Sequence, residues 1–267
     1  MTRYARRTRR TLQATGAGAA VLLLLSACSS TSDSADSADP SKPSGTITVF
    51  AAASLQESFT ELGARFEKEH PGTKVTFSFG GSDTLAANIT GGAPADVFAA
   101  ASPKTMAIVT DAEDVTGTPA TFVRNELQIA TLPGNPDKIS SLKDLTKSGL
   151  KVVLCDETVP CGAAAQTALE AAGLKVTPVS YEQDVKGALT KVELKEADAA
   201  LVYRTDVKAA GDKVEGVDFP ESAEAVNDYP IARLKDAPNP TAAEAFIELV
   251  RSTEGQKVLT EAGFLKP

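Results

Sequence analysis

The stretch from Ile47 to Phe66 constrains the fold of this chain more than any other. Residues Ile47–Phe50 are β-branched or aromatic and predict a short buried strand. Three alanines follow, and after Ser54 large apolar residues recur every three or four positions, as on one face of a helix. The stretch therefore predicts a strand that passes directly into a helix, with Ser54 at the junction.

Ser54 is expected to cap this helix, with Glu57 completing a capping box. The first N–H groups of a helix have no partner inside it and carry partial positive charge, which favours a bound anion. The small residues beside Ser54 leave room for an anion to approach the backbone. A plain cap without a ligand is the alternative interpretation of this serine.

Ser82 repeats the arrangement, because the predicted strand 74–79 and two glycines precede it and a helix is expected from Leu85. The Gly80–Gly81 pair lets backbone N–H groups point outward as a nest. This is not a P-loop, since no lysine follows at the required position. A capped glycine turn is the alternative here, yet two such junctions in one chain favour an anion site.

Strand-like and helix-like segments alternate along the rest of the chain. Further strands are predicted at 96–100, 127–130, 151–154 and 199–203, and further helices at 163–172, 185–194 and 246–258. Such alternation is typical of parallel sheets covered by helices, which collect ligands at the carboxyl ends of their strands. The segment 45–267 is long enough for one large or two small domains.

The first 27 residues read as a secretory signal, with five arginines, an apolar segment and a lipobox that ends at Cys28. Cys28 would be lipidated and become the mature N-terminus; an uncleaved anchor is the alternative. The run 8–12 also resembles a twin-arginine signal. Residues 28–44 are rich in Ser, Asp, Ala and Pro and predict a flexible tether.

Charge argues against two classes of partner. The chain has 27 basic and 35 acidic residues, and loss of five arginines with the signal leaves 22 against 35, a net charge of −13. This balance argues against nucleic acid and against an anionic membrane face as partner, so that membrane contact is expected only through the Cys28 lipid. A small anion stays possible, because a desolvated cleft is governed by its own local donors.

No familiar catalytic constellation is evident in the sequence. The one histidine, His70, lies in a charged turn, and no Cys/His cluster has metal-ligand spacing. Without a cofactor fingerprint, a binding protein is favoured over an enzyme. A thiol–disulfide enzyme that uses Cys155 and Cys161 is the remaining enzymatic alternative, although the spacing is not C-x-x-C.

Several motifs in the same order resemble the molybdate-binding proteins of ABC transporters, over about 46–264. They are 47–55 (ITVFAAASL), 82–86 (SDTLA), 92–98 (GAPADVF), 159–162 (VPCG), 184–189 (DVKGAL) and 201–203 (LVY). The resemblance implies an α/β, two-lobed periplasmic-binding-protein fold of type II, with two crossover strands and a mainly parallel sheet in each lobe. Lobe 1 would comprise 45–124 with 227–267, and lobe 2 would comprise 125–226.

The resemblance also implies a function and a ligand set. A lipid-anchored monomer on the outer face of the cell membrane would bind molybdate or tungstate between the lobes and deliver it to the transporter permease. The ligand donors would be the hydroxyls and amides of Ser54 and Ser82, the amides of Cys161 and Val185, and the hydroxyl of Tyr203. Another oxyanion, such as sulfate, phosphate or an organic acid, is the alternative ligand.

The implied donor set agrees with the chemistry of the ion. Molybdate is a fully deprotonated dianion at neutral pH, so it needs donors and no acceptor. Two positions depart from the family pattern: Cys161, where a well-known member carries alanine, and Asp83, whose carboxylate must point away from the anion. Tyr203, at a predicted strand end, is expected to link binding to lobe closure, unless it is a core residue.

Cys155 and Cys161 lie on either side of a short loop that precedes a predicted helix. Outside the cytoplasm disulfides persist, and Cys28 would be occupied by lipid. We therefore predict a Cys155–Cys161 disulfide that rigidifies the turn; two free buried thiols are the alternative.

Overall fold

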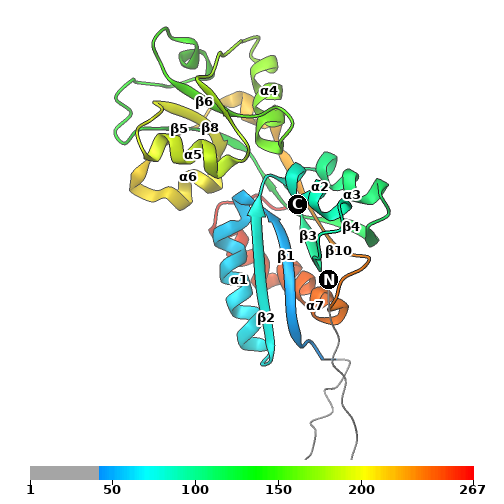
Figure 1. Cartoon of the computed structure of the whole chain (residues 1–267). Helices are drawn as coiled ribbons and strands as arrows, with labels where there is room; N and C mark the ends of the chain where they lie inside the picture. The colour runs from blue at the N-terminus through cyan, green and yellow to red at the C-terminus, as the bar shows by residue number, and fades with distance from the viewer. Residues whose placement is uncertain (1–41) are drawn as a thin grey trace, which may run out of the picture. The chain divides into compact units, whose positions relative to one another are not determined.

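The computed structural model describes residues Lys42–Pro267, which belong to one compact unit (Figure 1). The predicted signal, Cys28 and most of the predicted tether lie outside the described residues. No helix in the described part of the chain is long and apolar enough to cross a membrane.

Strands and helices alternate through most of the chain, as the sequence predicted. The strands are β1 (Gly45–Ala52), β2 (Thr73–Gly80), β3 (Val97–Ala99), β4 (Val115–Asn125), β5 (Leu127–Thr131), β6 (Val152–Cys155), β7 (Ser180–Glu182), β8 (Ala199–Tyr203), β9 (Glu215–Val217) and β10 (Asn227–Leu234). The α-helices are α1 (Gln56–Glu69), α2 (Ser82–Thr90), α3 (Pro103–Asp111), α4 (Pro160–Ala171), α5 (Val185–Glu193), α6 (Arg204–Ala210), α7 (Pro240–Arg251) and α8 (Thr253–Glu261). Short 3₁₀ helices are η1 (Ala53–Leu55), η2 (Leu142–Thr146), η3 (Gly211–Lys213) and η4 (Pro220–Ala225).

The strands form two five-stranded sheets, in the orders β2-β1-β3-β10-β4 and β7-β6-β8-β5-β9. The chain enters the second sheet where β4 leads into β5, and it returns to the first sheet as β10 (Figure 1). The predicted α/β class with two lobes is confirmed. The sheets are mixed rather than mainly parallel, because β10 and β5, which flank these crossings, run antiparallel to their neighbours.

Strand β1 lies inside the first sheet, and both of its faces are covered. Val49 packs with Phe59 of α1 and Phe246 of α7 on one face, whereas Phe50 packs with Leu85 of α2 on the other. Successive side chains of a strand point to opposite faces, so a strand buried on both faces is continuously apolar. This explains the Ile-Thr-Val-Phe-Ala-Ala-Ala run that opens the fold.

The predicted C-terminal helix 246–258 is two helices, α7 and α8, separated at Ser252. The Ser252 hydroxyl accepts a hydrogen bond of 3.1 Å from the Gly255 amide and so caps α8. A side chain on Gly255 would place its Cβ 2.2 Å from the Leu249 carbonyl oxygen, so the second helix starts tightly against the first. Apolar periodicity continues through the break, which is why the pattern alone indicated a single helix.

Cys155, at the end of β6, and Cys161, the second residue of α4, form the predicted disulfide. Its Cα atoms are 5.8 Å apart, and both side chains are buried. The bond therefore joins the carboxyl end of a strand to the start of the next helix.

We expect the purified protein to gain the mass of two hydrogens on reduction. Replacing Cys155 and Cys161 together by serine should lower the free energy of unfolding by about 2 kcal/mol, because the bridge restricts a short loop in the unfolded chain. Intact mass with and without reductant, followed by urea denaturation of both proteins, measures the two effects. An unchanged mass would mean that the thiols are free.

Candidate functional site

A pocket of about 20 Å³ lies between the two lobes, at the carboxyl ends of β1, β2 and β8. Its lining residues are Ala52, Ala53, Ser54, Gly80, Gly81, Ser82, Ala101, Val159, Pro160, Cys161, Asp184, Val185 and Tyr203. All five predicted ligand residues are among them. The volume is far below the few hundred Å³ that an organic ligand usually occupies.

Three helices begin at this pocket. Ser82 and Val185 are the first residues of α2 and α5, and Cys161 is the second residue of α4. Amides in the first turn of a helix have no acceptor inside the helix and carry partial positive charge. The pocket thus combines amide donors from one lobe and from the other, as an anion site requires.

Ser82 is 1% exposed, and its hydroxyl accepts a hydrogen bond of 3.0 Å from the Ala101 amide. The serine does not cap α2, because Gly81 takes the N-cap position and the helix begins at Ser82 itself rather than at Leu85. Since the oxygen of Ser82 already accepts from an amide, its own proton is left to donate.

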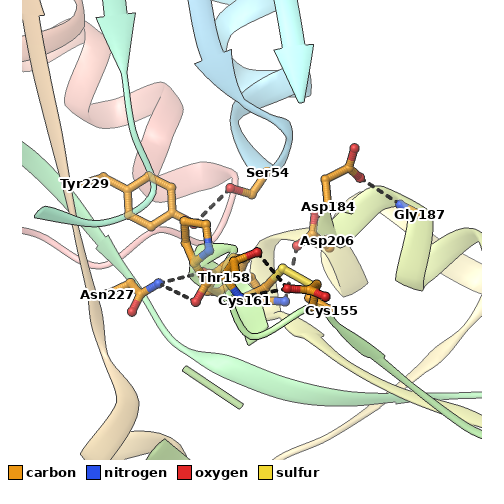
Figure 2. Close-up of a disulfide and its surroundings, with 12 residues drawn as sticks. Ser54, Cys155, Thr158, Cys161, Asp184, Gly187, Asp206, Asn227 and Tyr229 are labelled. Carbon is orange, nitrogen blue, oxygen red and sulfur yellow. Dashed lines mark hydrogen bonds between the residues drawn. A yellow bond between two sulfur atoms is a disulfide. The ribbon is translucent and has the colours of Figure 1, made fainter. Parts of the chain in front are cut away.

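The predicted capping box at Ser54 is wrong. The chain makes the 3₁₀ turn η1 before α1, so Leu55 takes the N-cap position and no side chain caps the helix. The Ser54 hydroxyl instead lies 2.9 Å from the hydroxyl of Tyr229, as Figure 2 shows, and Glu57 pairs with Lys186. A partner 175 residues away has replaced the local one.

Tyr203 ends β8 and is only 1% exposed. Its hydroxyl accepts a hydrogen bond of 2.7 Å from the side-chain nitrogen of Asn227. Burial raises the pKa of the Tyr203 hydroxyl well above its ordinary value, and the neighbouring Tyr229 adds to the shift. The hydroxyl therefore stays protonated and can donate. Tyr203 is buried, but it lines the pocket and is not confined to the core.

The described part of the chain places no cationic side chain on the pocket surface and a single carboxylate. Among the described residues that line it, none is Lys or Arg, and the one carboxylate is Asp184. Asp184 caps α5, where its side chain accepts a hydrogen bond of 2.9 Å from the Gly187 amide (Figure 2). The donors that remain for a ligand are neutral hydroxyls and amides.

Lys186 follows Val185 on α5 and joins the two lobes. Its ammonium lies 2.8 Å from the Glu57 carboxylate of α1 and 3.2 Å from the Asp206 carboxylate of α6. Burial lowers the pKa of Lys186, but attraction to Asp206 and Glu57 outweighs burial, and the net shift is upward. Lys186 is therefore a cation committed to two carboxylates beside the pocket.

Asp206 is fully buried and accepts a hydrogen bond of 3.2 Å from the Tyr203 amide. Burial raises the pKa of the Asp206 carboxyl to about 6, although Lys186 opposes the shift. The carboxylate thus holds the backbone of a pocket residue at one oxygen and faces the ammonium with the other.

The start of α4 is held tightly against the preceding loop. A side chain on Gly162 would place its Cβ 1.8 Å from the Asp156 carbonyl oxygen, so no other residue fits there without movement. The disulfide at Cys161 adds a covalent constraint to the same turn (Figure 2). The Cys161 amide is therefore a donor on rigid backbone.

The sequence did not identify five residues next to the predicted ligand set: Asn125, Lys186, Asp206, Asn227 and Tyr229. Asp206, Asn227 and Tyr229 contact Tyr203 or Ser54 directly. Lys186 and Asn125 in turn contact Asp206 and Tyr229. The segment around Asn227 contains Asn, Asp and Pro and looks like a turn, although it begins β10. Only spatial proximity to Ser54 and Tyr203 marks these residues as part of the site.

Comparison with known proteins agrees with the class that the fold and pocket define, a two-lobed binding protein for a small solute. The profile of the family described as bacterial extracellular solute-binding protein matches residues 47–265. The chain belongs to this family.

Two relatives narrow the comparison. The chain is 45% identical to the molybdate-binding protein ModA of Mycobacterium tuberculosis, over 83% of this chain and 85% of that protein. It is 34% identical to the molybdate-binding protein ModA of Escherichia coli, over 82% and 89% of the two chains. The predicted resemblance to the molybdate-binding proteins is confirmed.

Solved structures agree on the fold. The periplasmic molybdate-binding protein of Azotobacter vinelandii superposes with a TM-score of 0.73 at 21% identity, over 83% of this chain and 99% of that one. The sulfate-binding protein SubI of Mycobacterium tuberculosis superposes with a TM-score of 0.70 at 19% identity, over 82% and 86%. The shared fold therefore accommodates more than one oxyanion.

Replacing Asp206 by asparagine should stabilise the ligand-free protein increasingly as pH rises from about 5 to about 7.5. The folded pKa of about 6 lies above the ordinary value, so the folded wild type holds the proton more tightly and loses stability as pH rises through 6. The difference in unfolding free energy between variant and wild type should grow by about 1–2 kcal/mol over this range.

Urea denaturation at a series of pH values measures this difference. Ser58→Ala, which changes a buried hydroxyl and no titrating group, serves as the control, and its difference from wild type should stay constant. A pH-independent effect of Asp206→Asn would show that the carboxyl titrates as it does in the unfolded chain.

Proposed function

We propose that this protein captures molybdate or tungstate between its two lobes outside the cytoplasm and delivers it to the membrane permease of an ABC transporter. The observation that carries the proposal is the pocket where three helix starts and three hydroxyls meet without a lining Lys or Arg. A fully deprotonated dianion needs only donors, and this pocket supplies donors from both lobes. The identity to molybdate-binding relatives supports the same ligand.

The proposed ligand groups are the hydroxyls and amides of Ser54 and Ser82, the amides of Cys161 and Val185, and the Tyr203 hydroxyl. The first two residues belong to the lobe formed by 45–124 and 227–267, and the other three belong to the lobe formed by 125–226. An ion that contacts both groups binds best when the lobes are together, so binding favours closure.

The protein would act as a monomeric lipoprotein, attached through Cys28 to the outer face of the cell membrane by the tether 28–44. Such attachment keeps a released anion close to the permease. The protein would be a carrier and not an enzyme. A thiol–disulfide activity is disfavoured, because the bonded Cys155 and Cys161 are 2% and 3% exposed and offer little access to an attacking thiol.

Sulfate is the second candidate ligand, since a sulfate-binding protein shares the fold. Sulfate is a smaller tetrahedral dianion, and donors held on two rigid lobes cannot all reach it. Isothermal titration of the mature protein with molybdate, tungstate and sulfate should give similar affinities for the first two ions. Sulfate should bind about 100-fold more weakly, which equals the loss of one or two hydrogen bonds to a charged group. Preferential sulfate binding would overturn the assignment.

Removing single hydroxyls tests the site itself. Ser54→Ala, Ser82→Ala and Tyr203→Phe should each weaken molybdate binding by about 1.5–3 kcal/mol, or roughly 10- to 150-fold, because a hydrogen bond to a charged ligand is lost. For Tyr203→Phe, stopped-flow measurements should assign most of the loss to faster release.

Ser58→Ala is the matched control for these variants. Ser58 is buried on α1, the helix that follows Ser54. Its hydroxyl donates to the Leu55 carbonyl and is not among the groups that line the pocket. It should bind molybdate as wild type does. Unchanged affinity in all three pocket variants would place the anion elsewhere.

A further inference from the structure

Asn227 determines the direction of the Tyr203 proton. The side-chain nitrogen of Asn227 lies 2.7 Å from the Tyr203 hydroxyl oxygen and 3.4 Å from the Pro160 carbonyl oxygen. A carbonyl can only accept, so the nitrogen of this amide must face both groups. The Tyr203 oxygen is thus an acceptor toward Asn227, and its single proton is left for the pocket that Tyr203 lines or for the neighbouring Tyr229 hydroxyl.

Asn125 acts on the Ser54 hydroxyl in a similar way, through the hydroxyl of Tyr229 that lies between them. The Asn125 side-chain oxygen accepts from the Glu126 amide at 3.1 Å, which fixes its nitrogen toward Thr205 at 2.9 Å and Tyr229 at 3.4 Å. With Asn125 donating to Tyr229, the Tyr229 proton is available to the Ser54 oxygen 2.9 Å away, and this is the direction that the inference requires. The Ser54 proton is then free for the pocket.

Ser82 completes the pattern, since its oxygen accepts from the Ala101 amide. Each of the three hydroxyls that line the pocket therefore has an N–H donor behind it, directly or through Tyr229. Asn125 and Asn227 are register partners in β4 and β10, at the two points where the chain crosses between the sheets. The Asn125 and Asn227 side chains are thus attached to the strands at the crossings between the two lobes.

We propose that Asn227 and Asn125 are positioning residues that direct the Tyr203 and Ser54 protons into the pocket and make it select a fully deprotonated tetrahedral oxyanion over one that carries a proton. A pocket lined by hydroxyl and amide donors, whose one carboxylate already accepts from the Gly187 amide, disfavours an anion that carries its own proton. The inference rests on the proposed function and extends it to residues that do not touch the ligand.

Asn227→Asp tests the proposal with almost no change of shape. A carboxylate can only accept, so the Tyr203 proton should turn toward it and leave an oxygen lone pair facing the ligand. Molybdate affinity should fall about 10- to 150-fold, as in Tyr203→Phe. Inorganic phosphate at about pH 6, which carries at least one proton, should lose much less, so the molybdate-to-phosphate affinity ratio should fall at least about 10-fold.

The added negative charge is separated from proton direction by a double-mutant cycle. In a Tyr203→Phe background there is no hydroxyl to turn, so the further loss of molybdate affinity caused by Asn227→Asp is the effect of charge alone and should be smaller than its loss in the wild-type background. Asn239→Asp is the matched control, because Asn239 also donates its side-chain nitrogen to a carbonyl, that of Thr46, and does not line the pocket. It should leave the affinity ratio unchanged. Asn227→Leu, which removes the donor without adding charge, should lower affinity without lowering the ratio.

Titration of the wild type, run first, separates the two proposals. A wild type that prefers another tetrahedral dianion overturns the molybdate assignment, and the same cycle is then run with that ion. Fully additive losses, or a ratio that stays constant in Asn227→Asp, overturn the positioning role while the proposed function stands. A wild type that binds no tetrahedral oxyanion overturns both.

Discussion

An anion taken out of water must be stabilised by groups already fixed in place, and this requirement explains most of the structure around the pocket. The amides at the starts of α2, α4 and α5 are such groups, because the helices hold them in place and leave them without partners. In an α/β lobe, helix starts follow the carboxyl ends of strands. Two lobes that face each other with these ends create the donor set.

The lysine next to this donor set is paired with carboxylates and is not part of the set. Lys186 directly follows Val185, yet its ammonium is directed to Glu57 and the buried Asp206 and does not line the pocket. A lysine placed against a dianion would hold it as a buried ion pair, which is costly to separate. Neutral donors avoid that cost, so a ligand can be both bound and released by lobe movement. The ion pair instead joins α1 of one lobe to α5 of the other.

The crossing strands contribute more than a connection. Asn125 and Asn227 lie opposite each other where β4 ends and β10 begins, and their side chains reach Tyr229 and Tyr203. Burial raises the pKa of both tyrosine hydroxyls, so both remain protonated donors. Movement at the crossings would shift the groups that orient the ligand donors. In the proposed carrier, lobe closure at these crossings would therefore be coupled to hydroxyl orientation.

The sequence by itself determined the α/β class, the strand–helix junctions at Ser54 and Ser82, and the Cys155–Cys161 disulfide. The class and the junctions depend on local composition and spacing, since a β-branched run, small residues and a 3.6-residue period act over a few positions. The disulfide prediction rested on the expected location outside the cytoplasm. The family motifs also pointed to five residues that the fold brings to one pocket. They could do so because each motif is a short, continuous stretch at a strand end.

Tertiary structure alone decided how those residues are used. Ser54 gives up the expected cap for Tyr229, 175 residues away, and Tyr203 meets Asn227 from the other crossing strand. The mixed sheets likewise follow from pairing between distant segments, whereas the break at Ser252 is made by a local cap that the continuous apolar periodicity conceals. Hydrogen bonds between remote residues form only after two sheets and their crossings have been assembled, and no local pattern in the chain encodes such an encounter.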